Sequence, residues 1–290
     1  MFTLFQVACQ LAPDAEAQPP GGRPHPPRAV PADRLANPAS GASIAVYIDA
    51  PLSPGPHPAV VLVPGGLGAA GGSAGPGGIQ AYTNAGIVVV RFDPDGRGQS
   101  TGAEDYQGPA QQEGLRQVIK WAVARPEVRD DAVAVVSFSL GVSLATGAMD
   151  GGTTAARFLV DVEGPPSRSW MQGCRAVDAG VTFGGHSCTD NAYFSPREAV
   201  THVGGMKVPY MRVQGARDHF QGNRHDHAYE ILEAAAGKVP WVRLNDLAPS
   251  ATGYDRATID ASLPVQLDRT TLETWMPPRV TEMFKAVGVN

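Results

Sequence analysis

The chain has 290 residues, of which 43% are hydrophobic and 18% charged, and its net charge is −5. This composition is typical of a folded globular protein and excludes a disordered one, and the length suits one large α/β domain. The negative charge argues against nucleic acid or an anionic membrane surface as a partner. We also expect no membrane span, because no apolar run is long enough to cross a bilayer.

Residues 1–17 resemble the end of a secretion signal. A short, largely apolar run at 2–12 precedes Ala15-Glu16-Ala17, which has the small-x-small form of a cleavage site, although no basic stretch comes before it. A disordered tail is the alternative. We therefore expect a periplasmic or secreted protein, with residues 18–41 forming an extended arm rich in proline and glycine.

The cysteines fit export. Removal of residues 1–17 takes Cys9 away and leaves only Cys174 and Cys188, which enclose a short loop. In an oxidising compartment such a pair predicts a disulfide bond. Lipid attachment at Cys9 is a further alternative, although residues 6–8 make a poor lipobox.

Predicted strands alternate with predicted helices along residues 42–290. The strands are apolar, β-branched runs at 43–49, 59–63, 87–92, 132–136, 158–162, 210–214 and 241–244. Helical spacing and small residues predict helices at 79–84, 111–124, directly after Ser139, and at 228–236 and 280–287. Residues 167–206 have little strand character, so we expect a small cap insertion there. This order predicts an α/β fold with a doubly wound, mostly parallel sheet.

Residues 132–141 have the form of a nucleophile elbow. Five apolar residues lead into Ser137-Phe138-Ser139-Leu140-Gly141, and small residues follow that suit a closely packed helix. A strand that turns sharply into a helix exposes the serine at its tip, and the next backbone N–H faces the developing oxyanion. Ser139 is therefore the candidate nucleophile, although Ser137 stands where such turns usually have glycine. An ordinary strand–loop–helix junction with two serines is the alternative.

Together with three other motifs, this elbow resembles the α/β-hydrolase superfamily, nearest its dienelactone-hydrolase-like and small serine esterase branches. The resemblance covers residues 43–290, and its motifs are the strand into Pro64-Gly65-Gly66, the turn at 93–100, the elbow, and Gly215-x-x-Asp218 after a strand. It implies the α/β-hydrolase fold, catalysis without a cofactor, and an oxyanion hole formed by the N–H of Leu140 and that of Gly66, or of Leu67. It also implies Asp218 as the acid of a catalytic triad.

The histidine of the triad departs from the superfamily pattern. It normally follows the last strand, but this chain has no histidine beyond His227. We expect His219 to be the base instead, because it follows the strand two away from Ser139 and strands lie about 4.8 Å apart. Glu163 ends the strand between them and would orient His219, with Asp218 as a helper.

Other assignments of the base stay open. His227 is the possible alternative base, and Asp218 would then hold a histidine that folds back from position 225 or 227. A cap histidine, His186 or His202, is a further alternative.

Two alternatives from other classes of protein stay open, and the first involves the same loop. The donor types of a metal-assisted hydrolase are present together, in Asp218, His219, His225 and His227. A hydrolase-fold protein that has lost catalysis and serves as a binding protein is the second alternative. A nucleotide-binding oxidoreductase is disfavoured: residues 66–71 fit G-x-G-x-x-G and Asp93 is spaced to hold a ribose, but the Gly- and Pro-rich residues 72–78 argue against the helix that must follow.

The sequence therefore favours an exported serine hydrolase that cleaves a carboxylic ester through an acyl-enzyme on Ser139. We expect a small-molecule or polymeric ester as its substrate, and neither a metal nor a cofactor.

Overall fold

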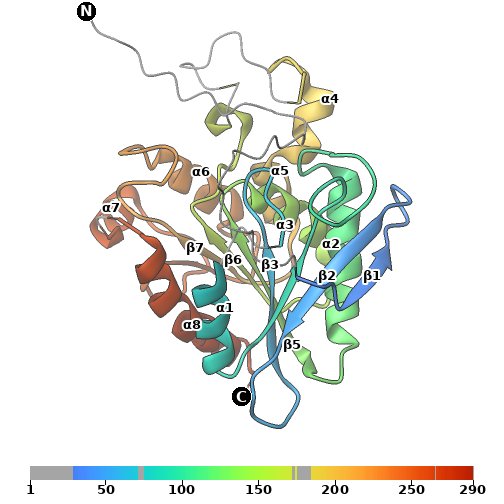
Figure 1. The fold of residues 1–290 in the computed structure, drawn as a ribbon. Helices are drawn as coiled ribbons and strands as arrows, with labels where there is room; N and C mark the ends of the chain where they lie inside the picture. Colours follow the sequence, from blue (N-terminus) through green and yellow to red (C-terminus); the bar gives the residue numbers. More distant parts are fainter. Residues whose placement is uncertain (1–28, 71–74, 172–173, 175–183, 265, 290) are drawn as a thin grey trace, which may run out of the picture. The chain divides into compact units, whose positions relative to one another are not determined.

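One eight-stranded sheet, in the order β1-β2-β4-β3-β5-β6-β7-β8, organises the chain (Figure 1). The strands are β1 (Asp33–Ala36), β2 (Ser43–Asp49), β3 (His57–Val63), β4 (Val88–Phe92), β5 (Val128–Phe138), β6 (Leu159–Val162), β7 (Tyr210–Val213) and β8 (Val242–Leu244). Strands β1, β2 and β4 pair antiparallel, and every pair from β4 to β8 is parallel. The carboxyl ends of β3 to β8 thus lie along one edge of the sheet, where open α/β sheets bind ligands.

The computed structural model describes residues 29–70, 75–171, 174, 184–264 and 266–289. Residues 31–290 form one compact unit, and of the unit that precedes it only Ala29 and Val30 are described. The expected signal segment and residues 18–28 of the expected arm therefore lie outside the described residues. Among the residues described, no helix combines the length and the apolar character that a membrane crossing requires.

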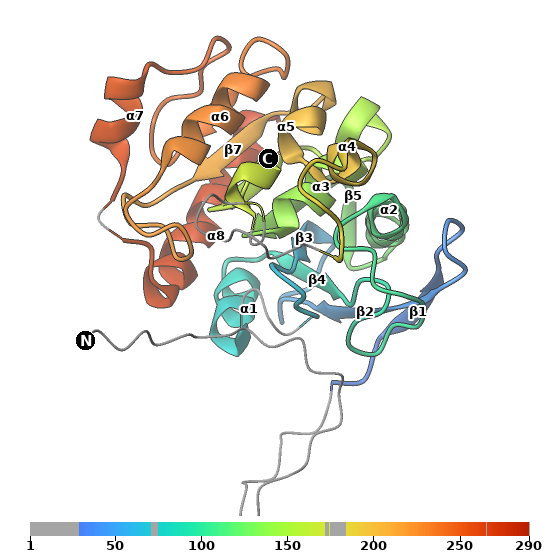
Figure 2. The same ribbon diagram turned by 90° about the horizontal axis from the view of Figure 1, so that it is seen from above.

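Helices cover both faces of the sheet (Figure 2). They are α1 (Gly75–Asn84), α2 (Pro109–Val123), α3 (Gly141–Met149), α4 (Asn191–Phe194), α5 (Ala199–His202), α6 (Asp226–Ala235), α7 (Arg256–Ser262) and α8 (Arg269–Ala286). Alternate residues of β3 enter different cores: Val61 packs with residues of α2, α3 and α6, and Val60 packs with residues of α1 and α8. This two-sided burial explains why the strand is a continuous apolar run.

The structure differs from the sequence-based prediction at several elements, and helix α7 (Arg256–Ser262) has no counterpart in that prediction. The last helix, predicted at 280–287, starts at Arg269 and runs through Pro277 and Pro278. A proline removes a helical hydrogen bond, but Met276, Val280 and Met283 are buried in the core, and this packing outweighs the local preference. The expected arm at 18–41 ends early, because Asp33–Ala36 pairs with β2 as an edge strand. Helix α1 begins at Gly75, inside the glycine-rich stretch that was not expected to support a helix.

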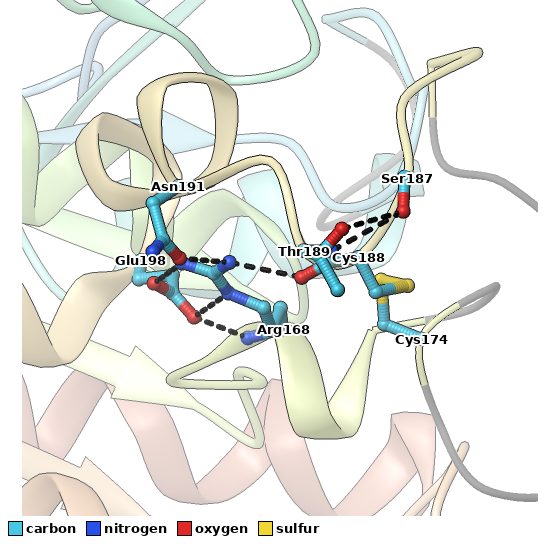
Figure 3. Close-up of a disulfide and its surroundings, with 7 residues drawn as sticks. All are labelled: Arg168, Cys174, Ser187, Cys188, Thr189, Asn191 and Glu198. Carbon is cyan, nitrogen blue, oxygen red and sulfur yellow. Dashed lines mark hydrogen bonds and ion pairs between the residues drawn. A yellow bond between two sulfur atoms is a disulfide. The ribbon is translucent and has the colours of Figure 1, made fainter.

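The described part of the segment between β6 and β7 is made of turns and short helices, as the low strand character of 167–206 predicts. Cys174 and Cys188 form the expected disulfide bond (Figure 3). Arg168 ties this region together by donating to the Cys188 carbonyl at 3.0 Å and to both carboxylate oxygens of Glu198 at 2.7 and 2.9 Å (Figure 3). Helix α5, at the end of the segment, packs against α3 and α6 and so belongs to the helical layer beside the sheet.

The disulfide should stabilise the protein. Its two cysteines are 14 residues apart, and closing a loop of that size contributes about 3 kcal/mol in the chain-entropy model. Reduction should therefore lower the melting temperature of protein made in an oxidising compartment, as calorimetry with and without reductant can measure. The double variant Cys174→Ser/Cys188→Ser is the control, because reductant should leave its melting temperature unchanged. Two free thiols in unreduced protein would contradict the pairing.

Candidate active site

Ser139 lies at the tip of a sharp turn between β5 and α3. Its φ is +51°, in the left-handed region that a non-glycine residue rarely adopts, and helix α3 begins only two residues later. Strand β5, the turn at Ser139 and the loop after β3 (residues 64–68) pack closely together. A β-carbon on Gly65 would lie 2.9 Å from Ser139 Cβ, and one on Gly141 would lie 2.7 Å from the Pro64 carbonyl. This is the geometry of a nucleophile elbow, with its serine half-buried at the carboxyl edge of the sheet.

Ser137, two residues earlier, is fully buried, and among the described residues its hydroxyl has no hydrogen-bond partner. The elbow therefore accommodates serine where others have glycine, and only Ser139 reaches the surface of the turn.

His219 connects Ser139 to a carboxylate. The Nε2 atom of His219 lies 2.9 Å from Ser139 Oγ, and its Nδ1 atom lies 2.9 Å from Glu163 Oε2. The three residues follow β5, β6 and β7, which are adjacent in the sheet. Because Nδ1 faces a carboxylate, the tautomer that satisfies both contacts carries its proton on Nδ1 and accepts from the Ser139 hydroxyl at Nε2.

Backbone donors hold Glu163 in place. Its carboxylate is 3% exposed, and it accepts the N–H of Gly215 at Oε1 and the N–H of His219 at Oε2, both at 3.0 Å. The residue itself has a φ of +50°. The loop that carries His219 is thus folded around the carboxylate that contacts its imidazole.

Asp218 lies where the resemblance places the acid, but its contacts are different. Its Oδ1 accepts the N–H groups of Phe220 and Gln221 at 2.7 and 2.8 Å, and its Oδ2 faces His227 Nε2 at 3.1 Å. Asp218 Oδ1 is 3.7 Å from His219 Nδ1, too far for a hydrogen bond. Asp218 therefore shapes the turn after His219, and Glu163 makes the direct contact with the imidazole.

Asp218 and His227 form a buried pair with opposite tendencies. Burial favours the neutral form of Asp218, but hydrogen bonds from His227 and from two backbone N–H groups outweigh it and hold the pKa of Asp218 well below its usual range. Burial also lowers the pKa of His227, against the opposing effect of Asp218. A neutral His227 then donates from Nε2, and its buried Nδ1 has no partner among the described residues.

The remaining candidate histidines each bond a different carboxylate. The pairs are His186 with Asp190, His202 with Asp150, and His225 with Asp260, each at 2.9 Å. Within the described part of the chain, only His219 hydrogen-bonds Ser139.

The four-residue metal cluster suggested by the sequence does not form as one site, because His225 turns to Asp260. The structure instead brings ligand atoms of Glu163, Asp218 and His219 within 4.8 Å of one another. A carboxylate oxygen has two lone pairs. Those of Glu163 Oε2 meet the N–H and the imidazole of His219, and those of Asp218 Oδ1 meet two backbone N–H groups. These oxygens face hydrogen-bond donors, so the donor set does not fit a cation.

The nucleotide-binding alternative also lacks its ribose ligand. Asp93 accepts from the N–H groups of Ala70 and Gln99 and from the Tyr47 hydroxyl, at 2.7 to 2.9 Å. Its carboxylate is thus committed to holding two loops of the protein.

The loop after β3 faces the elbow. Gly68 donates to the Gly65 carbonyl at 2.9 Å, which closes a tight turn with Gly66 at a φ of +55°. The Gly66 carbonyl accepts from Gln107 Nε2 at 2.6 Å and from the Arg97 guanidinium at 3.0 Å. Sequence motifs mark this loop and the turn that contains Arg97, whereas Gln107 belongs to no local motif.

No protein-family model and no curated protein sequence matches the chain. Solved structures of hydrolases do match it. An esterase of Pyrococcus furiosus, Pf2001, is 16% identical with a TM-score of 0.62, over 87% of this chain and 89% of that one. Est1E of Butyrivibrio proteoclasticus, solved with ferulic acid bound, is 15% identical with a TM-score of 0.59, over 88% and 100%. Acetyl xylan esterase 1 of a Thermoanaerobacterium species is 18% identical with a TM-score of 0.53, over 77% and 78%. The chain therefore has the α/β-hydrolase fold, as its motifs imply.

The Asp218–His227 pair predicts a pH-dependent stability. Because the pKa of His227 is lowered on folding, the unfolded chain binds an additional proton as the pH falls below about 6.5. The free energy of unfolding should then decrease with falling pH by up to about 1.4 kcal/mol per pH unit between pH 6.5 and 5. Asp218 adds its own loss only at much lower pH, because its pKa is depressed in the folded state. Urea unfolding at several pH values measures the slope.

His227→Gln should flatten this slope by up to about 1.4 kcal/mol per pH unit, the contribution of one proton. An unchanged slope in His227→Gln would contradict the neutral, buried state of His227.

Proposed function

We propose that the protein is a serine hydrolase that cleaves carboxylic esters through an acyl-enzyme on Ser139. One observation carries the proposal: a continuous hydrogen-bonded chain runs from Ser139 through His219 to the buried Glu163, at a nucleophile elbow. The esterases among the structural neighbours support ester hydrolysis for this fold.

In the first half-reaction, Ser139 Oγ forms a bond to the acyl carbon of the ester and passes its proton to His219 Nε2. The electron pair of the carbonyl moves to its oxygen, which the N–H of Leu140 and an N–H of the Gly66–Leu67 turn stabilise. The C–O bond to the alcohol then breaks, and the leaving oxygen takes the proton from Nε2. Water repeats the sequence on the acyl group, which releases the carboxylic acid and restores the Ser139 hydroxyl.

Glu163 has an orienting and electrostatic role in this mechanism. By accepting a hydrogen bond from the Nδ1–H of His219 it keeps the Nε2 lone pair directed at Ser139, and its negative charge stabilises the imidazolium that forms during each half-reaction. Asp218 supports the same loop from the other side through the turn at Phe220 and Gln221.

The residues around the site support a substrate ester with an apolar portion, and the disulfide supports export of the protein. Leu67 and Phe220 are 46% and 45% exposed, and they adjoin Gly66 and His219 in sequence, so each of these two loops carries an exposed apolar side chain. The Cys174–Cys188 disulfide supports a periplasmic or secreted location.

Replacement of the nucleophile should abolish turnover. Ser139→Ala should lower kcat for a p-nitrophenyl ester by about 10³-fold or more, because no other group can form the acyl-enzyme. The matched control is Ser137→Ala, which removes an unpartnered hydroxyl from the same turn and should keep most of the activity. Full activity of purified Ser139→Ala would exclude this mechanism. Absence of ester and amide turnover in the wild type would favour a binding protein.

The base should be the histidine in contact with Ser139. His219→Ala should lose nearly as much activity as Ser139→Ala, and the double variant should lose little more, because both residues act in one step. His227→Ala tests the alternative base. At a temperature where this variant stays folded, it should retain more activity than His219→Ala. The proposal fails if His219→Ala remains active while His227→Ala does not.

The two carboxylates should differ in the same assay. Glu163→Gln removes the acceptor that orients His219, and should lower kcat by about 10²-fold or more with little change in KM. Asp218→Asn keeps that contact and should lower stability more than kcat. A larger kcat loss in Asp218→Asn would assign the orienting role to Asp218.

A further inference from the structure

Two consecutive residues of the loop before α2 adopt a left-handed backbone. Tyr106 has a φ of +49° and Gln107 a φ of +67°, and neither is glycine. Such a conformation persists only where the surrounding structure holds it, and it tends to mark functional positions. Here the preceding residue is fixed from outside the loop, because Arg197 donates to the Asp105 carbonyl and carboxylate at 3.1 and 2.5 Å.

Gln107 is also fully buried, and its side chain points at the loop after β3 that contains Gly66. Its Nε2 donates to the Gly66 carbonyl at 2.6 Å, across 41 residues of sequence. Its own N–H donates to Gln111 Oε1 at 2.8 Å, and its carbonyl accepts from Gln112 Nε2 at 3.0 Å. The backbone N–H, the backbone carbonyl and the side-chain amide donor of Gln107 therefore each have a hydrogen-bond partner, and the side chain points at the Gly66 carbonyl.

The Gly66–Leu67 peptide lies at the centre of the turn that the hydrogen bond from Gly68 to the Gly65 carbonyl closes. A β-carbon built on Gly66 meets no described atom within 4 Å, so the space beside its α-carbon is open. Its carbonyl is held by Gln107 and Arg97 alone among the described donors. Since the C=O and N–H of a trans peptide point in opposite directions, holding the Gly66 carbonyl on one side turns the N–H of Leu67 to the other.

We propose that Gln107 is a positioning residue of the oxyanion hole, acting through the Gly66 carbonyl on the N–H of the Gly66–Leu67 peptide. This inference rests on the proposed serine hydrolase mechanism. Gln107 does not touch the substrate, and Arg97 shares the task but also pairs with Glu104, at 2.6 and 2.7 Å. Replacing Gln107 therefore tests the orientation of the peptide without breaking an ion pair, whereas replacing Arg97 would break its pair with Glu104.

The test compares Gln107→Leu with the wild type in two assays. Loss of an oriented oxyanion donor should lower kcat for a p-nitrophenyl ester by about 10- to 100-fold with little change in KM. The affinity for a trifluoromethyl ketone, which forms a tetrahedral oxyanion adduct with a serine, should weaken by a similar factor. An unchanged kcat and an unchanged ketone affinity would overturn the proposal.

Gln107→Gly separates donation from backbone strain. Glycine accepts a positive φ at no steric cost, so this variant relieves the strain while removing the donor. It should lose as much kcat as Gln107→Leu, and wild-type kcat in Gln107→Gly would overturn the proposal even if Gln107→Leu does not fold.

Asn245→Leu is the matched control for general destabilisation. Asn245 is also buried, has a φ of +47°, and donates from its amide to backbone carbonyls, those of Gln214 and Ser262. Its replacement should lower the melting temperature and leave the ratio of ketone affinity to substrate KM unchanged. If wild-type protein neither turns over esters nor binds the ketone, the proposed function itself fails, and that result is distinct from an active wild type with an unaffected Gln107→Leu.

Discussion

The carboxylate of Glu163 is the group on which the candidate site depends. Strands β5, β6 and β7 end in register, with Phe138 beside Val162 and Val162 beside Val213, so the residues that follow them start from neighbouring positions at one edge of the sheet. Glu163 accepts hydrogen bonds from two N–H groups of the loop after β7, those of Gly215 and His219. These bonds hold the loop over Glu163 and place His219 in contact with Ser139. Ser139 and Glu163 both keep a positive φ, at a cost on the order of 1–3 kcal/mol each, and the packed turns around them hold that strain.

The absence of a histidine after β8 in this chain is matched by a shift of the whole arrangement. In the proposed mechanism the acid and the base each follow the strand one place nearer the elbow than the resemblance to the superfamily implies. Asp218, which occupies the usual place of the acid, is paired instead with the buried His227. The pair supports the turn beside His219. Burial lowers the pKa of His227, and hydrogen bonds from His227 and two backbone N–H groups hold the pKa of Asp218 below its usual range.

Much of this arrangement follows from sequence because it depends on local patterns and on the order of parallel strands. Apolar runs locate the strands, and the elbow motif locates Ser139. The contacts of His219 with Ser139 and with Glu163 follow from the spacing of neighbouring strands. Other features depend on contacts that no local pattern records. Helix α8 passes through Pro277 and Pro278 because its core contacts outweigh two lost hydrogen bonds, and Gln107 meets Gly66 only through the tertiary fold.

The central claim, that Ser139 is activated by His219 and not by His227, can be tested by covalent labelling with a fluorophosphonate. Such a probe reacts with a serine only where a base takes its proton and an oxyanion hole receives the phosphoryl oxygen. Peptide mass spectrometry should find one adduct, on Ser139, in the wild type and in folded His227→Ala, and no adduct in folded His219→Ala. An adduct on another serine, or labelling that persists in His219→Ala and disappears in His227→Ala, would contradict the account.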